Sequence, residues 1–160
     1  MKIRMQITAV LSWINLVIAS ILVLSGLIMT QVYSQLLTIL TSVVLAGAII
    51  LHSYAALQLR KSILHPEIPL SRNTPTGIRF MGLMAFFYAI LNAVSGASII
   101  QHSGEYVKQM KIPPGAEHLP LGEIVQVAGV LSLLFSLTIG LNVLLNLRAL
   151  RWWYISQRPS

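Results

Sequence analysis

Four long apolar runs constrain this chain more than any other feature of its sequence. They cover approximately residues 7–29, 36–59, 80–100 and 124–147. Each run is long enough to cross a hydrocarbon core of roughly 30 Å as a helix, which takes about 20 residues. The runs are continuously apolar rather than alternating, which argues against the strands of a membrane barrel. The sequence therefore predicts an all-α integral membrane protein, a four-helix transmembrane bundle that forms one domain over residues 1–160.

The composition of the chain and its low content of charged residues also indicate a membrane protein. The chain is 56% hydrophobic and 9% charged, whereas about a quarter of the residues in a soluble domain are charged. It has no cysteine, so disulfides, thiolate metal sites and thioether-bound haem are excluded. The composition thus leaves a membrane domain with no soluble domain attached.

The net charge of +7 is unevenly distributed along the chain. Nine of the eleven Lys and Arg residues lie at the termini or between the second and third runs: Lys2, Arg4, Arg60, Lys61, Arg72, Arg79, Arg148, Arg151 and Arg158. This positive-inside bias predicts that both termini and the 60–79 segment face the cytoplasm, as in a bacterial inner membrane. Anionic lipid headgroups, rather than nucleic acid, are the expected partners of these charges.

The polar segment 60–79 divides the four runs into two pairs. Pro66, Pro69 and Pro75 interrupt any helix there, because proline lacks the backbone N–H and its ring clashes with the preceding turn. We expect a cytoplasmic hinge over 60–79 that joins two antiparallel hairpins. The segment 101–123 then forms an outer loop, and its Pro113-Pro114-Gly115 run predicts a turn.

Small residues recur every four positions in the third and fourth runs. They are Ala85, Ala89, Ala93 and Ala97 in one run, and Ala128, Ser132, Ser136 and Gly140 in the other. Small side chains let two helix backbones approach closely in lipid. We expect these two rows to pack against each other, with contact to another protein as the alternative.

A weak internal repeat relates the two hairpins. Ser25-Gly26 followed by Gln31 matches Ser95-Gly96 followed by Gln101. The tetrapeptide at 57–60, Leu-Gln-Leu-Arg, matches Leu-Asn-Leu-Arg at 145–148. Either the chain is a parallel two-plus-two duplication, or these apolar helices resemble one another by chance.

Polar residues fall at similar depths in the cytoplasmic halves of the four runs. They are the candidate ligand-binding residues Asn15, His52, Tyr88, Asn92 and Asn142. Two explanations are open for this polar layer. Interhelical hydrogen bonds are the simpler one. A pocket for a headgroup, a quinone-like ring or a small solute is the other, with His52 as its titratable member.

The outer loop holds weak candidates for a metal site. His102 and Glu105 are three residues apart, and Glu117 and His118 follow the proline turn. Imidazoles and carboxylates bind zinc, but this spacing matches no closed zinc motif. We therefore predict no metal and no cofactor. A bis-histidine haem is disfavoured because His52 and His102 are expected near opposite membrane faces.

Three classes of function remain. The sequence has no glycine-rich phosphate loop, no nucleophile elbow and no H-E-x-x-H motif. A non-enzymatic scaffold or accessory subunit, working in a homo-oligomer or a larger assembly, fits best. A small carrier or pore for an apolar or weakly polar solute, built around the polar layer, is the first alternative. A membrane-embedded enzyme acting on a lipid or a quinone is the second.

Overall fold

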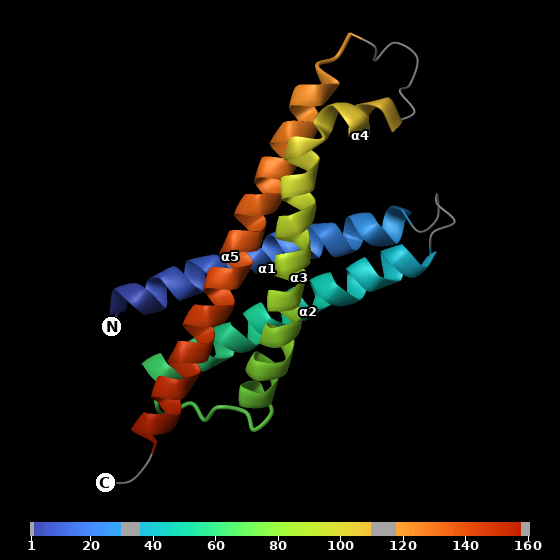
Figure 1. Cartoon of the computed structure of the whole chain (residues 1–160). Coiled ribbons are helices and arrows are strands. Elements are labelled where there is room, and N and C mark those ends of the chain that lie inside the picture. The colour runs from blue at the N-terminus through green and yellow to red at the C-terminus, as the bar shows by residue number, and fades with distance from the viewer. Residues whose placement is uncertain (1, 30–35, 110–117, 158–160) are drawn as a thin grey trace. The chain divides into compact units, whose positions relative to one another are not determined.

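The computed structural model describes residues 2–29, 36–109 and 118–157, which form helices and no strand (Figure 1). The elements are α1 (Lys2–Met29), α2 (Leu36–Leu64), α3 (Thr74–Gln101), α4 (Ser103–Gln109) and α5 (Leu121–Ser156). The predicted all-α class is confirmed. The connection between the first two runs, at 30–35, and the proline turn predicted at 113–115 lie outside the described residues.

Four of these helices are long and apolar enough to cross a membrane. The candidate spans are Met5–Ser25, Val43–Leu64, Thr74–Gln101 and Leu121–Ser156. Their length and composition indicate a multi-pass membrane protein. They also agree with the four apolar runs of the sequence.

The chain divides into two compact units. The first unit comprises Met1–Tyr88 and Thr138–Ser160, and the second comprises Ala89–Leu137. Helices α3 and α5 therefore contribute one part to each unit. In the first unit these parts join α1 and α2, and in the second they join α4.

Helix α1 packs against α2 in the first unit and buries a narrow face of small and polar residues. This face consists of Ala9, Ser12, Asn15 and Ala19, which recur at the three- and four-residue spacing of one helix side. The large apolar residues Trp13, Val17 and Ile21 point outward and are more than half exposed. An arrangement with large side chains outside and small ones inside suits a helix surrounded by lipid.

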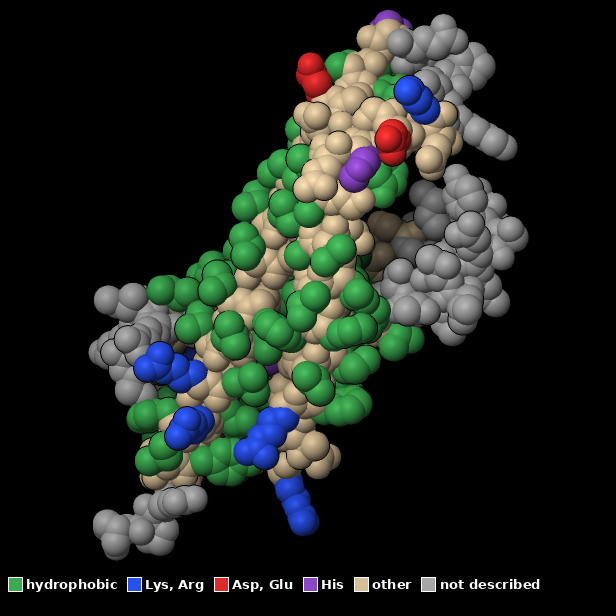
Figure 2. All heavy atoms as spheres, in the orientation of Figure 1, with side chains coloured by type: hydrophobic (Ala, Val, Ile, Leu, Met, Phe, Trp, Pro, Cys, Tyr) green, Lys and Arg blue, Asp and Glu red, His purple; other side chains and the backbone are tan. Residues whose placement is uncertain are grey.

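An apolar cluster gathers the ends of three helices in the first unit. Leu59 of α2, Ile78 of α3 and Leu150 of α5 are each at most 2% exposed, and Leu70 and Trp153 pack against them. Because all of these belong to segments that carry Lys and Arg, the cluster brings the basic segments together. On the face drawn in Figure 2, Lys and Arg side chains gather over these ends of α3 and α5.

The connection between α2 and α3 is shorter than the predicted hinge. Helix α2 continues to Leu64, and α3 begins at Thr74, so the segment outside the helices is 65–73. Pro66 explains the end of α2, since it disfavours the helical conformation in the residue before it. Pro75 lies in the first turn of α3, where a missing N–H costs nothing, and so it does not interrupt the helix.

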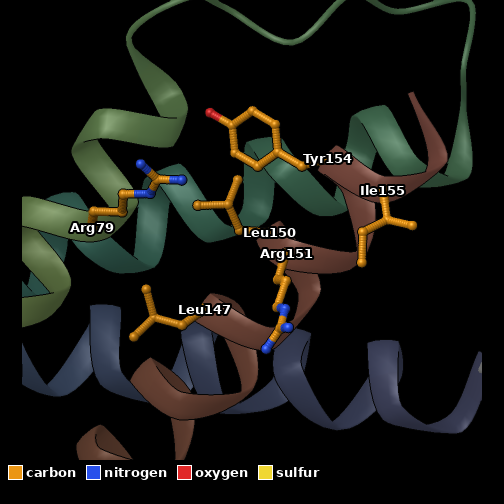
Figure 3. A pocket seen from close by; sticks show the side chains of 6 residues that line it. All are labelled: Arg79, Leu147, Leu150, Arg151, Tyr154 and Ile155. Atoms are coloured by element: carbon orange, nitrogen blue, oxygen red, sulfur yellow. The ribbon is translucent and has the colours of Figure 1, made fainter. Parts of the chain in front are cut away.

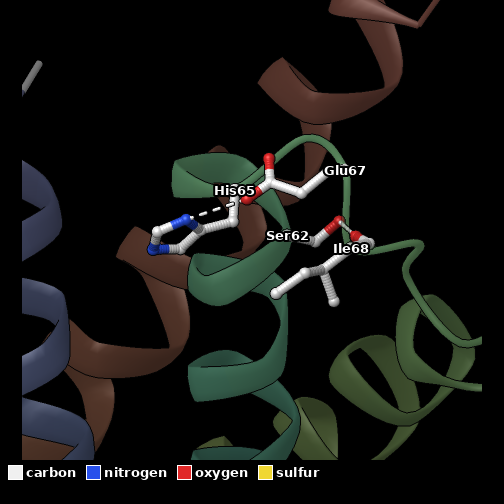
Figure 4. Close-up of polar contacts among 4 residues, drawn as sticks. All are labelled: Ser62, His65, Glu67 and Ile68. Atoms are coloured by element: carbon white, nitrogen blue, oxygen red, sulfur yellow. Dashed lines mark hydrogen bonds and ion pairs between the residues drawn. The ribbon is translucent and has the colours of Figure 1, made fainter.

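Hydrogen bonds fold this connection back onto the end of α2 (Figure 4). Ser62 Oγ donates to Ile68 O at 3.0 Å, and Ile68 N donates to His65 O at 2.9 Å. His65 Nδ1 lies 3.1 Å from Glu67 Oε1, but both side chains are well exposed. A solvent-exposed pair of this kind contributes little to stability. The backbone turn and Ser62 therefore fix the connection.

Candidate functional site

Helices α1 and α5 meet in the first unit through hydrogen bonds between polar side chains. Asn142 Oδ1 accepts one bond from Ser12 Oγ at 3.0 Å and another from Asn146 Nδ2 at 2.9 Å. Asn15 and Thr138 pair reciprocally: Asn15 Nδ2 donates to Thr138 O at 3.2 Å, and Thr138 Oγ1 donates to Asn15 Oδ1 at 2.9 Å. We call these five residues the polar seam.

The helical repeat explains why the polar seam forms. Thr138, Asn142 and Asn146 are four residues apart, so they stack on one face of α5. Ser12 and Asn15 are three apart on the buried face of α1. The sequence analysis selected both asparagines that bond across the seam, Asn15 and Asn142. It did not select Ser12, because a lone serine in an apolar run carries no distinguishing signal.

His52 occupies a different helix contact, between α2 and α3. Its side chain is 1% exposed, and its Nδ1 lies 3.2 Å from Ile78 O. A Cβ atom added to Gly82 would lie 3.0 Å from two atoms of the imidazole ring. The absence of a side chain at Gly82 therefore makes room for His52. In the sequence, a glycine within an apolar helix such as Gly82 is the feature that can indicate such a close contact.

The second ring nitrogen of His52 has no hydrogen-bond partner among the described residues. Nε2 is buried, and so is the equally unpartnered Oγ of the next residue, Ser53. A buried polar atom without a partner costs free energy, so such atoms are uncommon in folded proteins. Among the five polar-layer residues, His52 is the one with a buried polar atom that has no partner within the described part of the chain.

The polar seam leaves little space for a ligand. A hollow lined by Asn146, Arg60 and Leu59 has a volume of about 20 Å³, which accommodates about one water molecule. Two larger hollows in the first unit lie at the helix ends. One, of about 360 Å³, is lined by Met5 and Trp152 among others, and the other, of about 620 Å³, contains Arg79.

The remaining two polar-layer candidates do not join the seam. Tyr88 is half-buried on α3 in the first unit. Asn92 belongs to the second unit, where its Nδ2 donates to Ser132 O at 3.0 Å and to Ser136 Oγ at 2.9 Å. The five predicted residues thus fall into separate helix contacts.

Helices α3 and α5 approach each other closely in the second unit at two glycines, Gly96 and Gly129. A Cβ atom added to Gly96 would lie 2.9 Å from Gly129 O, and one added to Gly129 would lie 2.9 Å from Gly96 O. Both positions are buried. Asn92 and Ser132 extend the same contact by a mutual pair of bonds to each other's backbone oxygens.

The predicted rows of small residues follow this contact only in part. Ala85, Ala89 and Ser136 are buried, whereas Ala128 is exposed and Gly129 makes the close contact in its place. Residues four apart drift by about 40° per step around a helix, because one turn holds 3.6 residues. A row of three such steps therefore rotates by about 120° and leaves the contact face. The other row members, Ala93, Ala97, Ser132 and Gly140, are partly buried.

The weak metal candidates do not converge. His102 Nδ1 lies 3.2 Å from Ser98 O, so the ring turns back onto α3. Glu105 and His118 are exposed, and Glu117 lies outside the described residues. Within residues 2–29, 36–109 and 118–157 there is no group of three or more metal-ligating side chains. Ser103, the first residue of α4, instead accepts a bond from Gln126 Nε2 of α5 at 3.1 Å.

Comparison with protein-family models, curated proteins and solved structures finds no match to this chain. Its function is therefore argued from its own residues.

Proposed function

We propose that this chain is a non-enzymatic membrane subunit that works in a homo-oligomer or a larger membrane assembly. The observation that carries the proposal is the polar seam. Its side chains bond to one another, as in Ser12 with Asn142 and Asn15 with Thr138. The adjoining hollow accommodates about one water molecule. Polar groups that bond to one another in this way hold helices together.

Outward-facing small residues support contact with neighbours. Ala128 is exposed on α5, and a Cβ atom added to Gly47 of α2 would meet nothing within 4 Å. Helices that present small residues to lipid let a neighbouring helix approach closely. The subunit thus has open positions for helix contact in addition to those it uses internally.

Native mass spectrometry of the tagged chain, extracted gently from its own membrane, tests this proposal. We expect a mass that corresponds to several copies of the chain or to the chain with other polypeptides. The matched control is the same sample after a harsher detergent, which separates protein partners and yields a single chain with a mass of 17.6 kDa plus that of the tag. A single chain in the gentle extract would contradict the proposal.

We further propose that both termini and the α2–α3 connection face the cytoplasm, with the bundle in a bacterial inner membrane. The apolar cluster supports this placement, since it joins the basic ends of α2, α3 and α5. Met5, near the start of α1, shares a hollow with Ile63 and Arg148 from the same ends. Basic residues concentrate on the cytoplasmic side of inner-membrane proteins.

Cysteine labelling tests this orientation directly, because the chain has no cysteine of its own. We expect Ser71→Cys, in the α2–α3 connection, to react with a membrane-impermeant maleimide only after the cells are opened. His118→Cys, before α5, is expected to react in intact cells. Both positions are exposed, so a difference between them reports sidedness. The reverse pattern would contradict the proposed topology.

A small carrier or pore for an apolar or weakly polar solute is the second candidate, and the unpartnered Nε2 of His52 is the observation that favours it. Ionisable residues inside a membrane are costly, and they often mark a functional site. In this case a bound solute would supply the missing partner. The seam residues, which are already bonded, would hold the helices around it.

Replacing His52 with leucine separates the two candidates. We expect the free energy of unfolding of His52→Leu in detergent to lie within about 0.5 kcal/mol of the wild-type value, or above it. The reason is that the substitution removes a buried polar atom that has no hydrogen-bond partner. For a subunit, native mass spectrometry should show no small-molecule mass that is lost on substitution. A fixed non-lipid mass on the wild type that is absent from an equally stable His52→Leu would favour the carrier.

A further inference from the structure

A groove at the basic end of the first unit combines positive charge with an apolar lining. It has a volume of about 620 Å³. Helix α3 contributes one residue and α5 contributes five: Arg79, Leu147, Leu150, Arg151, Tyr154 and Ile155. Figure 3 shows Leu150 between Arg79 and Arg151, with the Tyr154 ring beside the Arg79 guanidinium. Arg79 and Arg151 belong to two basic segments that are far apart in the sequence, and the fold brings both to one groove.

The arginines of this groove have no acidic partner. Among the described residues the single ion pair joins His65 to Glu67. Arg79 Cζ lies 5.4 Å from the centroid of the Tyr154 ring, a cation–π contact that holds the side chain while leaving its charge unneutralised. Arg151 is exposed. The groove therefore has one guanidinium group on each side of Leu150, and no acidic residue of the described segments neutralises either of them (Figure 3).

The lining favours an anion that carries an acyl chain. Leu150 forms a buried floor, whereas Leu147 and Ile155 are 37% and 60% exposed on the helix surface. Tyr154 stacks edge-to-face on Trp153, with ring centroids 5.3 Å apart. Aromatic side chains next to arginines at the end of a membrane span are typical of the headgroup level. A soluble anion would use the two charges but would leave the apolar surface without a partner.

We propose that this groove binds an anionic phospholipid, with its phosphate at Arg79 and Arg151 and an acyl chain along Leu147 and Ile155. Guanidinium groups form strong charge-assisted hydrogen bonds with phosphate. Basic pockets between membrane helices recognise anionic headgroups in this manner. The inference requires membrane insertion of the chain but not its role as a subunit.

Lipid titration of the purified full chain, followed by native mass spectrometry, tests the site. The probes are phosphatidylglycerol and phosphatidylcholine with identical acyl chains. We expect wild type to retain phosphatidylglycerol preferentially. The double variant Arg79→Gln/Arg151→Gln should bind phosphatidylglycerol at least about a hundredfold more weakly, because each of the two lost charge-assisted bonds contributes about tenfold or more.

A matched double variant controls for net charge. Lys61→Gln/Arg72→Gln removes the same charge from the basic end of the same unit, on α2 and in the α2–α3 connection, but neither residue lines the groove. Its affinity for phosphatidylglycerol should stay within about threefold of wild type, because surface charges act weakly at a distance. Equal weakening in the two double variants would overturn the site, and so would equal wild-type binding of the two lipids.

Two further measurements keep the outcome decisive. Phosphatidylglycerol should raise the unfolding temperature of wild type more than phosphatidylcholine does, and the absence of this difference would overturn the proposal even if the groove variant failed to fold. Millimolar glycerol phosphate should not displace the lipid, and displacement would identify a soluble anion as the ligand instead. The amount of wild-type protein in the membrane fraction is measured separately. A protein that fails to insert into the membrane is thereby distinguished from an inserted protein that does not select phosphatidylglycerol.

Discussion

Replacement of Gly129 with leucine is expected to destabilise the protein by about 1–2 kcal/mol. A Cβ atom at this position already lies 2.7 Å from Ile100 Cγ1 and 2.9 Å from Gly96 O. The isoleucine side chain can move, but the carbonyl belongs to the α3 backbone, so the helices must separate. Overpacking of this kind typically costs about 1–3 kcal/mol, and the better helix propensity of leucine offsets up to about 1 kcal/mol of it.

The neighbouring residue provides the control for this prediction. Ala128→Leu adds bulk one position earlier on α5, where the side chain is exposed. Leucine on a lipid-facing surface is expected to change stability by less than about 0.5 kcal/mol. Thermal unfolding in detergent measures both variants. The glycines would not form the contact between α3 and α5 if Gly129→Leu had the unfolding temperature of wild type. The same conclusion would follow if Ala128→Leu lowered the unfolding temperature as much as Gly129→Leu does.

The difference between these two positions shows how far the sequence determines the structure. Long apolar runs specify helices of membrane length, because no other local structure satisfies the backbone within lipid. Proline chemistry specifies where α2 stops. The contact face is a finer property, since it depends on helix rotation. Spacing by four identifies Ala128, whereas the 3.6-residue turn brings Gly129 to α3.

The candidate site likewise has features that the sequence predicts and features that depend on how the helices pack. Asn15, His52 and Asn142 are recognisable from sequence, because polar residues are rare in apolar runs. Their partners are not, because bonding depends on which helices are neighbours. Asn142 bonds with Ser12, 130 positions earlier in the chain, and His52 lies against Gly82. The groove at Arg79 and Arg151 was likewise beyond sequence reasoning, since it requires the start of α3 and the end of α5 to meet.

Replacement of Asn142 with alanine is expected to cost about 1–3 kcal/mol of stability. Its Oδ1 is the acceptor for both Ser12 Oγ and Asn146 Nδ2, and hydrogen bonds between membrane helices contribute about 0.6 kcal/mol on average and up to about 1.7 kcal/mol each. The substitution leaves two buried donors without their acceptor. Leu141→Ala, at the adjacent lipid-facing position, is the control for lost volume and should change stability by less than about 0.5 kcal/mol.

A double-mutant cycle shows whether the loss belongs to the seam. Ser12→Ala alone removes one bond, and Asn142 retains its bond from Asn146, so the expected cost is about half that of Asn142→Ala. The double variant should be more stable than the sum of the two losses predicts, since the hydroxyl left unpaired by Asn142→Ala is then absent. Strict additivity would mean that Ser12 and Asn142 do not bond. A non-additive result would show that Ser12 and Asn142 stabilise the helix contact by bonding to each other. His52 would then be the first polar-layer residue to test for ligand binding.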